Sequence, residues 1–183
     1  SEPDRYRFLA SYVAGRPIGI AQTREGEPAH TDGHTIYVSA DSTDDGPLRE
    51  GLLQGALLAA GSLDRKVVGR LRARPSLARR YLVLEGHRAL SALVPRVPRA
   101  ATLCPDTPTI STSPEHSLDI AASRTSIADP PPWFGVIKPS RLLKSAPSPA
   151  GAATDNNIRL GIDEAEQREL DDSDENDDDS PVE

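Results

Sequence analysis

The chain has 183 residues and a net charge of −7, and 37% of its residues are apolar but only 4% aromatic. An apolar content this low excludes a chain that packs a core along its whole length, so we expect one modest domain joined to less ordered segments. The single cysteine, Cys104, excludes a disulfide scaffold and a cysteine-based zinc site.

The sequence contains no run of about 18 apolar residues, so we expect no membrane-spanning helix. Its charged start, residues 1–8, lacks the apolar region of a signal peptide. Together with the cysteine usage, these features predict a cytoplasmic protein. The absence of methionine indicates either a removed initiator or a piece of a longer protein.

The spacing of apolar residues in the first hundred residues alternates between helical and strand periods. It predicts helices over residues 4–14, 48–60, 64–74 and 76–94, and short strands over 17–22 and 34–40. Asp44 or Asp45 is the expected N-cap of the second helix, and Ser76 that of the fourth. We therefore expect an α+β domain over residues 1–99, mainly helical with a short β-hairpin.

The composition changes after Pro95, because eleven of the 17 prolines lie between Pro95 and Pro149. We expect residues 100–160 to be loosely ordered, since they cannot bury enough apolar surface to offset chain entropy.

Within that region, residues 130–143 form an island that holds the only tryptophan of the chain. We predict that this segment docks elsewhere and that Trp133 and Phe134 contact a partner. Residues 161–183 are predicted to be an acidic disordered tail, because twelve Asp or Glu stand against one Arg from residue 163 on.

The middle of the chain is basic, with ten Lys or Arg between Ser62 and Ala100 against Asp64 and Glu85. Such a segment can bind nucleic acid. However, Tyr81 is its only aromatic residue and the whole chain is acidic. We favour a solvated or partner-facing surface, or one visited by the acidic tail of the same chain. Weak nucleic-acid binding through residues 65–99 is an alternative.

The stretch HTDGHTIYVSAD, residues 30–41, allows two interpretations. If it were one strand, His30, Asp32 and His34 would point to one side and could bind a metal ion. Asp32-Gly33 is also a strong turn signal, and a turn would break that alternation. We favour the turn and expect no metal or other cofactor. The alternative is a metal-dependent hydrolase with a degenerate zincin-like arrangement.

The other candidate chemistry lies in the predicted helices. The helix over residues 48–60 lacks the histidines of the His-Glu-x-x-His pattern of metalloproteases. Glu85 and His87 are two residues apart, so they point away from each other on a helix and form no dyad. We expect Glu85 to pair with Arg88, or with Arg79 or Arg80, at the helix surface. Because Glu85 follows three apolar residues, a partly buried structural ion pair is the alternative. No nucleophile, base and orienting group come together, so we expect no catalytic residues.

Four segments carry a resemblance to a known family, in the order RFLASYVAGRPIGIAQ, AHTDGHTIYVSAD, LLQGALLAAGSLD and LARRYLVLEGHRAL. Together they resemble the N-terminal region of actinobacterial proteins related to the NorD-type nitric-oxide-reductase activation proteins, which are similar to CobT-type proteins. The resemblance covers roughly residues 5–95. The family's strand entry, Thr-Asp-Gly-x-x-Ile, is matched by Thr31, Asp32, Gly33 and Ile36. A later helix motif, Leu-Glu-Asp-x-Arg, is approximated by Leu84, Glu85 and Arg88.

Members of this family continue through an acidic linker into a von Willebrand factor A domain and act as adaptors for MoxR-type AAA+ ATPases. The resemblance therefore implies a non-catalytic interaction or adaptor module, the N-terminal part of such a protein. Its expected partner is a protein, either the ATPase or a client enzyme. The family's metal-type helix is not matched, so the resemblance implies no metal.

Overall fold

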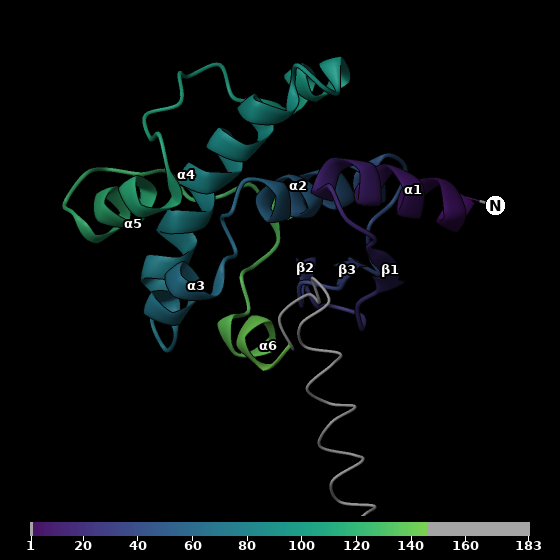
Figure 1. Cartoon of the computed structure of the whole chain (residues 1–183), viewed down its shortest axis with the longest axis horizontal. Helices are drawn as coiled ribbons and strands as arrows, with labels where there is room; N and C mark the ends of the chain where they lie inside the picture. The colour runs from purple at the N-terminus through teal and green to yellow at the C-terminus, as the bar shows by residue number, and fades with distance from the viewer. Residues whose placement is uncertain (1, 146–183) are drawn as a thin grey trace, which may run out of the picture. The chain divides into compact units, whose positions relative to one another are not determined.

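The computed structural model describes residues 2–145 (Figure 1). The acidic tail predicted over 161–183 lies outside the described residues, as does the end of the region predicted to be loosely ordered over 100–160. Residues 2–145 belong to one compact unit. None of the helices in this part of the chain is both long and apolar enough to cross a membrane.

The four helices predicted from the apolar spacing are present as α1 (Glu2–Ala14), α2 (Gly46–Ala59), α3 (Arg65–Leu71) and α4 (Pro75–Leu93). The N-cap of α2 is Asp45, one of the two predicted residues, although its side chain makes no capping hydrogen bond. The predicted N-cap of α4 is wrong, because Arg74 occupies that position and Ser76 lies inside the first turn. Pro75 explains the shift, since proline is preorganised for the first helical position.

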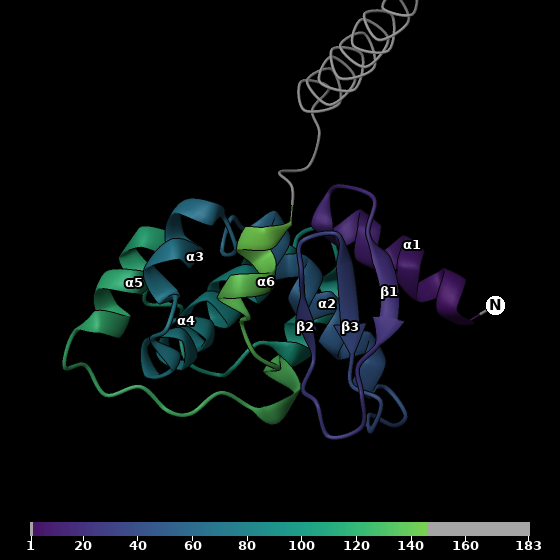
Figure 2. The same ribbon diagram turned by 90° about the horizontal axis from the view of Figure 1, so that it is seen from below.

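Three short strands form a mixed sheet in the order β1-β3-β2: β1 (Gly19–Gln22), β2 (His30–Thr31) and β3 (Thr35–Val38). The hairpin is formed by β2 and β3, which pair antiparallel. The first predicted strand is not part of that hairpin, because β1 pairs parallel to β3 on the other side. Figure 2 shows β3 between the other two strands, with α1 and α2 behind the sheet.

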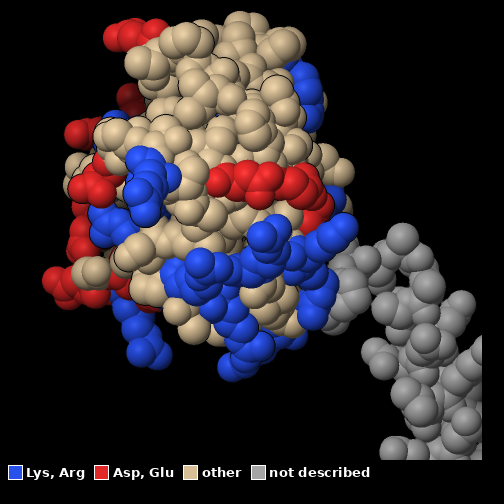
Figure 3. All heavy atoms as spheres, turned by 90° about the vertical axis from the view of Figure 1, so that its left-hand side faces the viewer, with Lys and Arg blue, Asp and Glu red and all other residues tan. Residues whose placement is uncertain are grey.

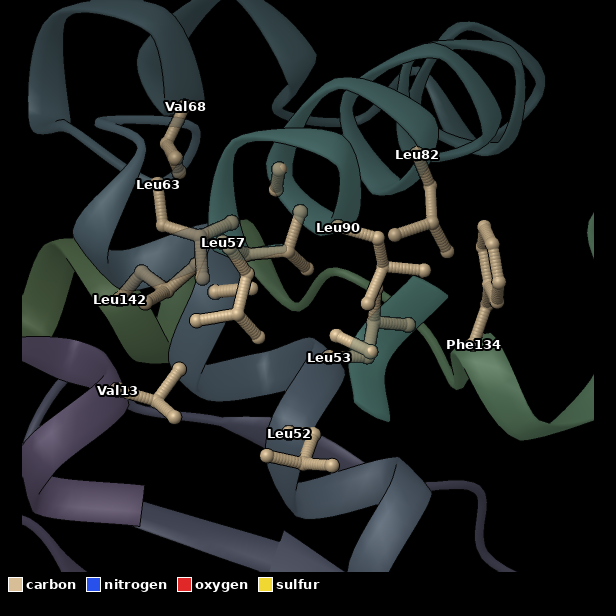
Figure 4. Close-up of a cluster of buried hydrophobic side chains, with 14 residues drawn as sticks. Val13, Leu52, Leu53, Leu57, Leu63, Val68, Leu82, Leu90, Phe134 and Leu142 are labelled. Atoms are coloured by element: carbon tan, nitrogen blue, oxygen red, sulfur yellow. The ribbon is translucent and has the colours of Figure 1, made fainter. Parts of the chain in front are cut away.

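The core of the domain lies between α2 and α4. Figure 4 shows Leu53 and Leu57 of α2 close to Leu90 of α4, with Leu142 at one end of the cluster and Phe134 at the other. A second buried cluster joins α3, α4 and α5 (Pro114–Ala122), and a third joins α1 to the sheet. Helix α2 is thus enclosed by elements from both ends of the described chain.

The predicted domain boundary at residue 99 is not where the packing ends, because the compact unit continues to Ser145. Beyond residue 99 lie η1 (Pro98–Leu103), α5, η2 (Pro132–Phe134) and α6 (Pro139–Lys144). Leu118, Phe134 and Leu142 of this part are buried in the core clusters. The prediction of a loosely ordered region is therefore wrong for residues 100–145. The composition misled it, because a few widely spaced apolar side chains are enough when each enters a groove made by earlier helices.

Candidate functional site

The turn between β2 and β3 is built by Asp32 and Thr31. The Oδ1 atom of Asp32 accepts hydrogen bonds from the backbone N–H groups of His34 and Thr35, both at 2.8 Å. Thr31 Oγ1 donates to the carbonyl of Thr35 at 2.7 Å, and Gly33 adopts a φ of +96°. Only glycine takes this left-handed conformation without strain, which confirms the predicted Asp-Gly turn.

The charge of Asp32 is fixed by the same turn. Burial alone would raise the pKa of this carboxyl group, but hydrogen bonds from the backbone of Thr35 and His34 and from the Tyr37 hydroxyl outweigh it. The pKa of Asp32 therefore lies below its ordinary value. Asp32 is thus a carboxylate anion that stabilises the turn by accepting these hydrogen bonds.

His30 lies on β2 with only 1% of its surface exposed, whereas His34 is exposed at the turn. The Nε2 atom of His30 contacts the guanidinium of Arg141, and Nδ1 lies 3.0 Å from the carbonyl oxygen of Pro28. Because a guanidinium can only donate, Nε2 is the acceptor and Nδ1 carries the proton. Both ring nitrogens of His30 are therefore occupied within the chain.

The environment of His30 also disfavours its charged form. Burial lowers the pKa of His30, and the positive charges of Lys138 and Arg141 lower it further, against the opposing effect of the Pro28 carbonyl. The ring stacks on Tyr37 with 4.9 Å between the ring centroids. His30 is thus a neutral side chain that joins the hairpin to α6.

The three side chains considered as metal ligands, His30, Asp32 and His34, do not converge. Within residues 2–145, no group of three or more His, Cys, Asp or Glu side chains is arranged to hold a metal ion. The turn at Gly33 separates the buried His30 on β2 from the exposed His34.

Glu85 forms the second polar cluster, and it is not at the helix surface as predicted, because its exposed fraction is 0%. Its carboxylate accepts two hydrogen bonds from Arg88, each at 2.7 Å, so the predicted partner is present. It also accepts from the hydroxyls of Ser62 at 2.8 Å and Ser117 at 2.6 Å. The favoured surface position is wrong because α5, which carries Ser117, was not foreseen, and the alternative of a buried structural ion pair is the arrangement present.

The same cluster ties three parts of the chain together. Arg88 Nη2 donates to the carbonyl of Ala60 at 2.7 Å, and the Tyr81 hydroxyl donates to the carbonyl of Ser62 at 2.6 Å. The hydrogen bond to Glu85 raises the pKa of Arg88 further, although burial opposes it. Four donors satisfy the Glu85 carboxylate, so the arrangement is a closed ion pair rather than an exposed reactive group.

Sequence reasoning missed the serines of this cluster, Ser62, Ser111 and Ser117. Ser117 donates to Glu85 and therefore accepts from Ser111, 2.6 Å away. One local signal could have found α5: Ser113 precedes Pro114, and its hydroxyl caps the helix by accepting from the backbone N–H of His116 at 3.1 Å. Serine followed by proline is a typical helix start.

The island over residues 130–143 docks on its own domain. Phe134 is 1% exposed and packs onto Gly86, where a Cβ atom would lie 2.9 Å from Phe134 Cδ2 and closer still to Cε2. The carbonyl of Phe134 accepts a hydrogen bond from Gln54 Nε2 at 3.1 Å, and the His87 ring meets the phenyl ring edge-on. Phe134 is therefore a core residue, and the prediction that it contacts a partner is wrong.

The neighbouring residues complete this docking. The backbone N–H of Val136 donates to the carbonyl of Ala29 at 2.9 Å, which joins the segment to the loop before β2. Trp133 is half-buried, and the guanidinium of Arg49 lies 5.4 Å from the centroid of its ring. Part of Trp133 stays accessible, in contrast to Phe134.

The other residues that match the NorD-type motifs have structural roles in the fold. Ile36 has no exposed surface and lies in the cluster between α1 and the sheet. Leu84 is buried in the cluster of α3, α4 and α5. Together with the turn and the ion pair described above, these residues shape the domain.

One helix carries large exposed apolar side chains. Phe8 and Tyr12 of α1 are 70% and 55% exposed, and they lie one turn apart on the helix. The guanidinium of Arg96 lies 4.9 Å from the Tyr12 ring centroid, and its Nη2 donates to the carbonyl of Tyr12 at 2.6 Å. We call Phe8, Tyr12 and Arg96 the aromatic surface of α1.

No protein-family model, no curated protein and no solved structure matches the chain. The resemblance to NorD-type proteins therefore rests on the four sequence segments alone.

Proposed function

We propose that the chain is a non-catalytic interaction module, the N-terminal part of a NorD-type adaptor that works with a MoxR-type AAA+ ATPase. In this role it helps the ATPase to activate or remodel a client enzyme. The proposal is supported by what the motif residues do in the structure. Asp32 holds the turn before β3, and Glu85 and Arg88 form a buried ion pair, so all three stabilise the fold. Because these polar groups stabilise the fold, we assign the function of the domain to binding of a partner by its exposed surface.

The aromatic surface of α1 is the contact that we assign to the ATPase. Aromatic residues and arginine contribute most to binding energy at protein interfaces. Phe8 and Tyr12 stand on a helix that packs against α2, so they are presented on a rigid support. Their exposed area is large enough to stabilise a complex by a few kcal/mol, at about 25 cal/mol per Å² of apolar surface buried.

The test uses the purified full chain and a purified MoxR-type AAA+ ATPase. We expect binding in titration calorimetry and a change in the ATP hydrolysis rate. The double variant F8S/Y12S should weaken binding at least tenfold. The control is I110S, because Ile110 is as exposed as Tyr12, at 55%, but lies outside α1. The proposal fails if the wild-type chain neither binds the ATPase nor changes its rate.

A further inference from the structure

A dense group of exposed cations covers α3 and the start of α4. We call it the basic surface, and it consists of Arg65, Lys66, Arg70, Arg72, Arg74 and Arg79. Figure 3 shows Lys and Arg gathered over one part of this face, with few acidic side chains among them. These six residues fall within fifteen positions of the sequence, and Asp64 is the only acidic residue between Ser62 and Leu84.

Most of these charges have no acidic partner. Arg65 donates to the carbonyls of Leu143 and Ser145, and Arg79 lies 3.4 Å from Asp129 in an exposed pair. Among the described residues, the other four cations of the basic surface make no ion pair. Neighbouring positive charges repel one another, so an added anionic partner lowers the electrostatic energy of this surface.

The shape of the surface is open. A Cβ atom at Gly69, on the exposed side of α3, would meet nothing within 4 Å. Residues 65–79 contain no aromatic side chain, and the nearest one in sequence, Tyr81, is fully buried. The surface therefore offers guanidinium groups, which bind carboxylate or phosphate oxygens in pairs, and no ring on which a base could stack.

We propose that the basic surface binds an acidic, Asp- and Glu-rich segment of a partner protein. Residues 1–145 carry 19 Lys or Arg against 15 Asp or Glu, so this part of the chain is positive although the whole chain is negative. A short acidic segment can fit a carboxylate to each guanidinium of a compact surface.

The experiment measures fluorescence anisotropy of a labelled polyglutamate of about 20 residues with the full chain, at low and at physiological salt, because exposed charges are screened by salt. The variant K66Q/R70Q/R72Q removes three charges from the basic surface. The control R5Q/R7Q/R24Q removes three exposed charges from α1 and from the loop after β1. All six positions are exposed, so both variants should fold, and circular dichroism checks this.

We expect the first variant to lose at least tenfold in affinity for polyglutamate, and the control to lose less than about twofold. Equal losses in the two variants would show that net charge alone matters, and would overturn the proposal. So would an undetectable affinity of the wild-type chain at low salt. Tighter binding of a 20-base-pair duplex than of polyglutamate would assign the surface to nucleic acid instead. The basic surface lies on α3 and α4, whereas the surface assigned to the ATPase lies on α1. The polyglutamate experiment can therefore succeed or fail independently of ATPase binding.

Discussion

Gly86 decides how a distant segment packs. A glycine inside a helix destabilises it by up to about 1 kcal/mol relative to alanine. At this position of α4 the missing side chain leaves room for the Phe134 ring, which closes the end of the main core cluster. The residues of the sequence LEGHR therefore have structural roles. Glu85 and Arg88 form the buried ion pair on one side of α4, and Gly86 leaves space for the Phe134 ring on another side.

We expect G86A to destabilise the domain by about 2–3 kcal/mol, because the added methyl group overlaps the Phe134 ring and forces it to move. Urea denaturation measures this change. The matched control is G69A on α3, where a Cβ atom meets nothing and the same substitution should stabilise by up to about 1 kcal/mol. A stabilising effect of both substitutions would contradict the packing of Phe134 on α4.

The substitution E85Q tests the buried ion pair. It should cost about 3–5 kcal/mol of unfolding free energy, because it leaves the half-buried Arg88 guanidinium without its counter-charge. Chemical denaturation gives the value, and E25Q, in an exposed loop, is the control with an expected change below about 0.5 kcal/mol. If E85Q were as mild as E25Q, Glu85 and Arg88 would not form the buried pair described above.

At the scale of elements, α6 is attached to the hairpin through charged and aromatic side chains. Lys138 and Glu27 form an ion pair, Arg141 contacts His30, and the Arg141 guanidinium lies 5.2 Å from the Tyr37 ring centroid. Leu142 of the same helix enters the main core. The attachment depends on a neutral His30, because a protonated ring would offer Arg141 no acceptor.

Stability should therefore fall as the pH is lowered from about 7.5 to 5.5. The pKa of His30 is lowered in the folded state, so the unfolded state takes up its proton first, near its ordinary value of about 6.5. The contribution of His30 is complete above that value and is lost below it, by up to about 1.4 kcal/mol per pH unit. Burial also lowers the pKa of His87, so the wild-type slope contains both groups.

The variant H30Q should flatten this dependence in urea denaturation curves recorded across the pH range. The variant H87Q provides the comparison, because it removes only the other contributing group and should keep the part of the slope that belongs to His30. An unchanged slope in H30Q would mean that His30 takes up its proton in the folded state as readily as in the unfolded one.

The elements differ in how far the sequence could predict them. Helices α1 to α4 follow from apolar spacing, and the turn follows from Asp32-Gly33, because both signals are local. The parallel pairing of β1 with β3 was not predicted, since nothing local distinguishes it from a hairpin. The burial of Glu85 depends on Ser117, which is 32 residues away. The candidate site was thus predictable as single residues and pairs, and its closure by α5 and α6 was not.

At the scale of the whole molecule, residues 100–145 complete a core that begins in α1. We expect a chain that ends at residue 99 to lack a cooperative thermal transition, because it loses Leu118, Phe134 and Leu142 from the buried clusters. A chain that ends at Ser145 should melt cooperatively, since it keeps all of these side chains. Circular dichroism compares the two with the full chain, and a cooperative melt of the shorter chain would restore the boundary at residue 99.

The contacts of residues 132–142 also have a kinetic consequence. Gln54 and Phe134 are 80 residues apart in sequence, and both Glu27–Lys138 and His30–Arg141 span 111 residues. Contacts of such high sequence separation form slowly, because closing a long loop is entropically unfavourable. During translation, the helix that carries Gly86 leaves the ribosome before Phe134 does. The nascent domain thus passes through a stage with an open apolar groove, which is the stage most exposed to aggregation and to chaperones.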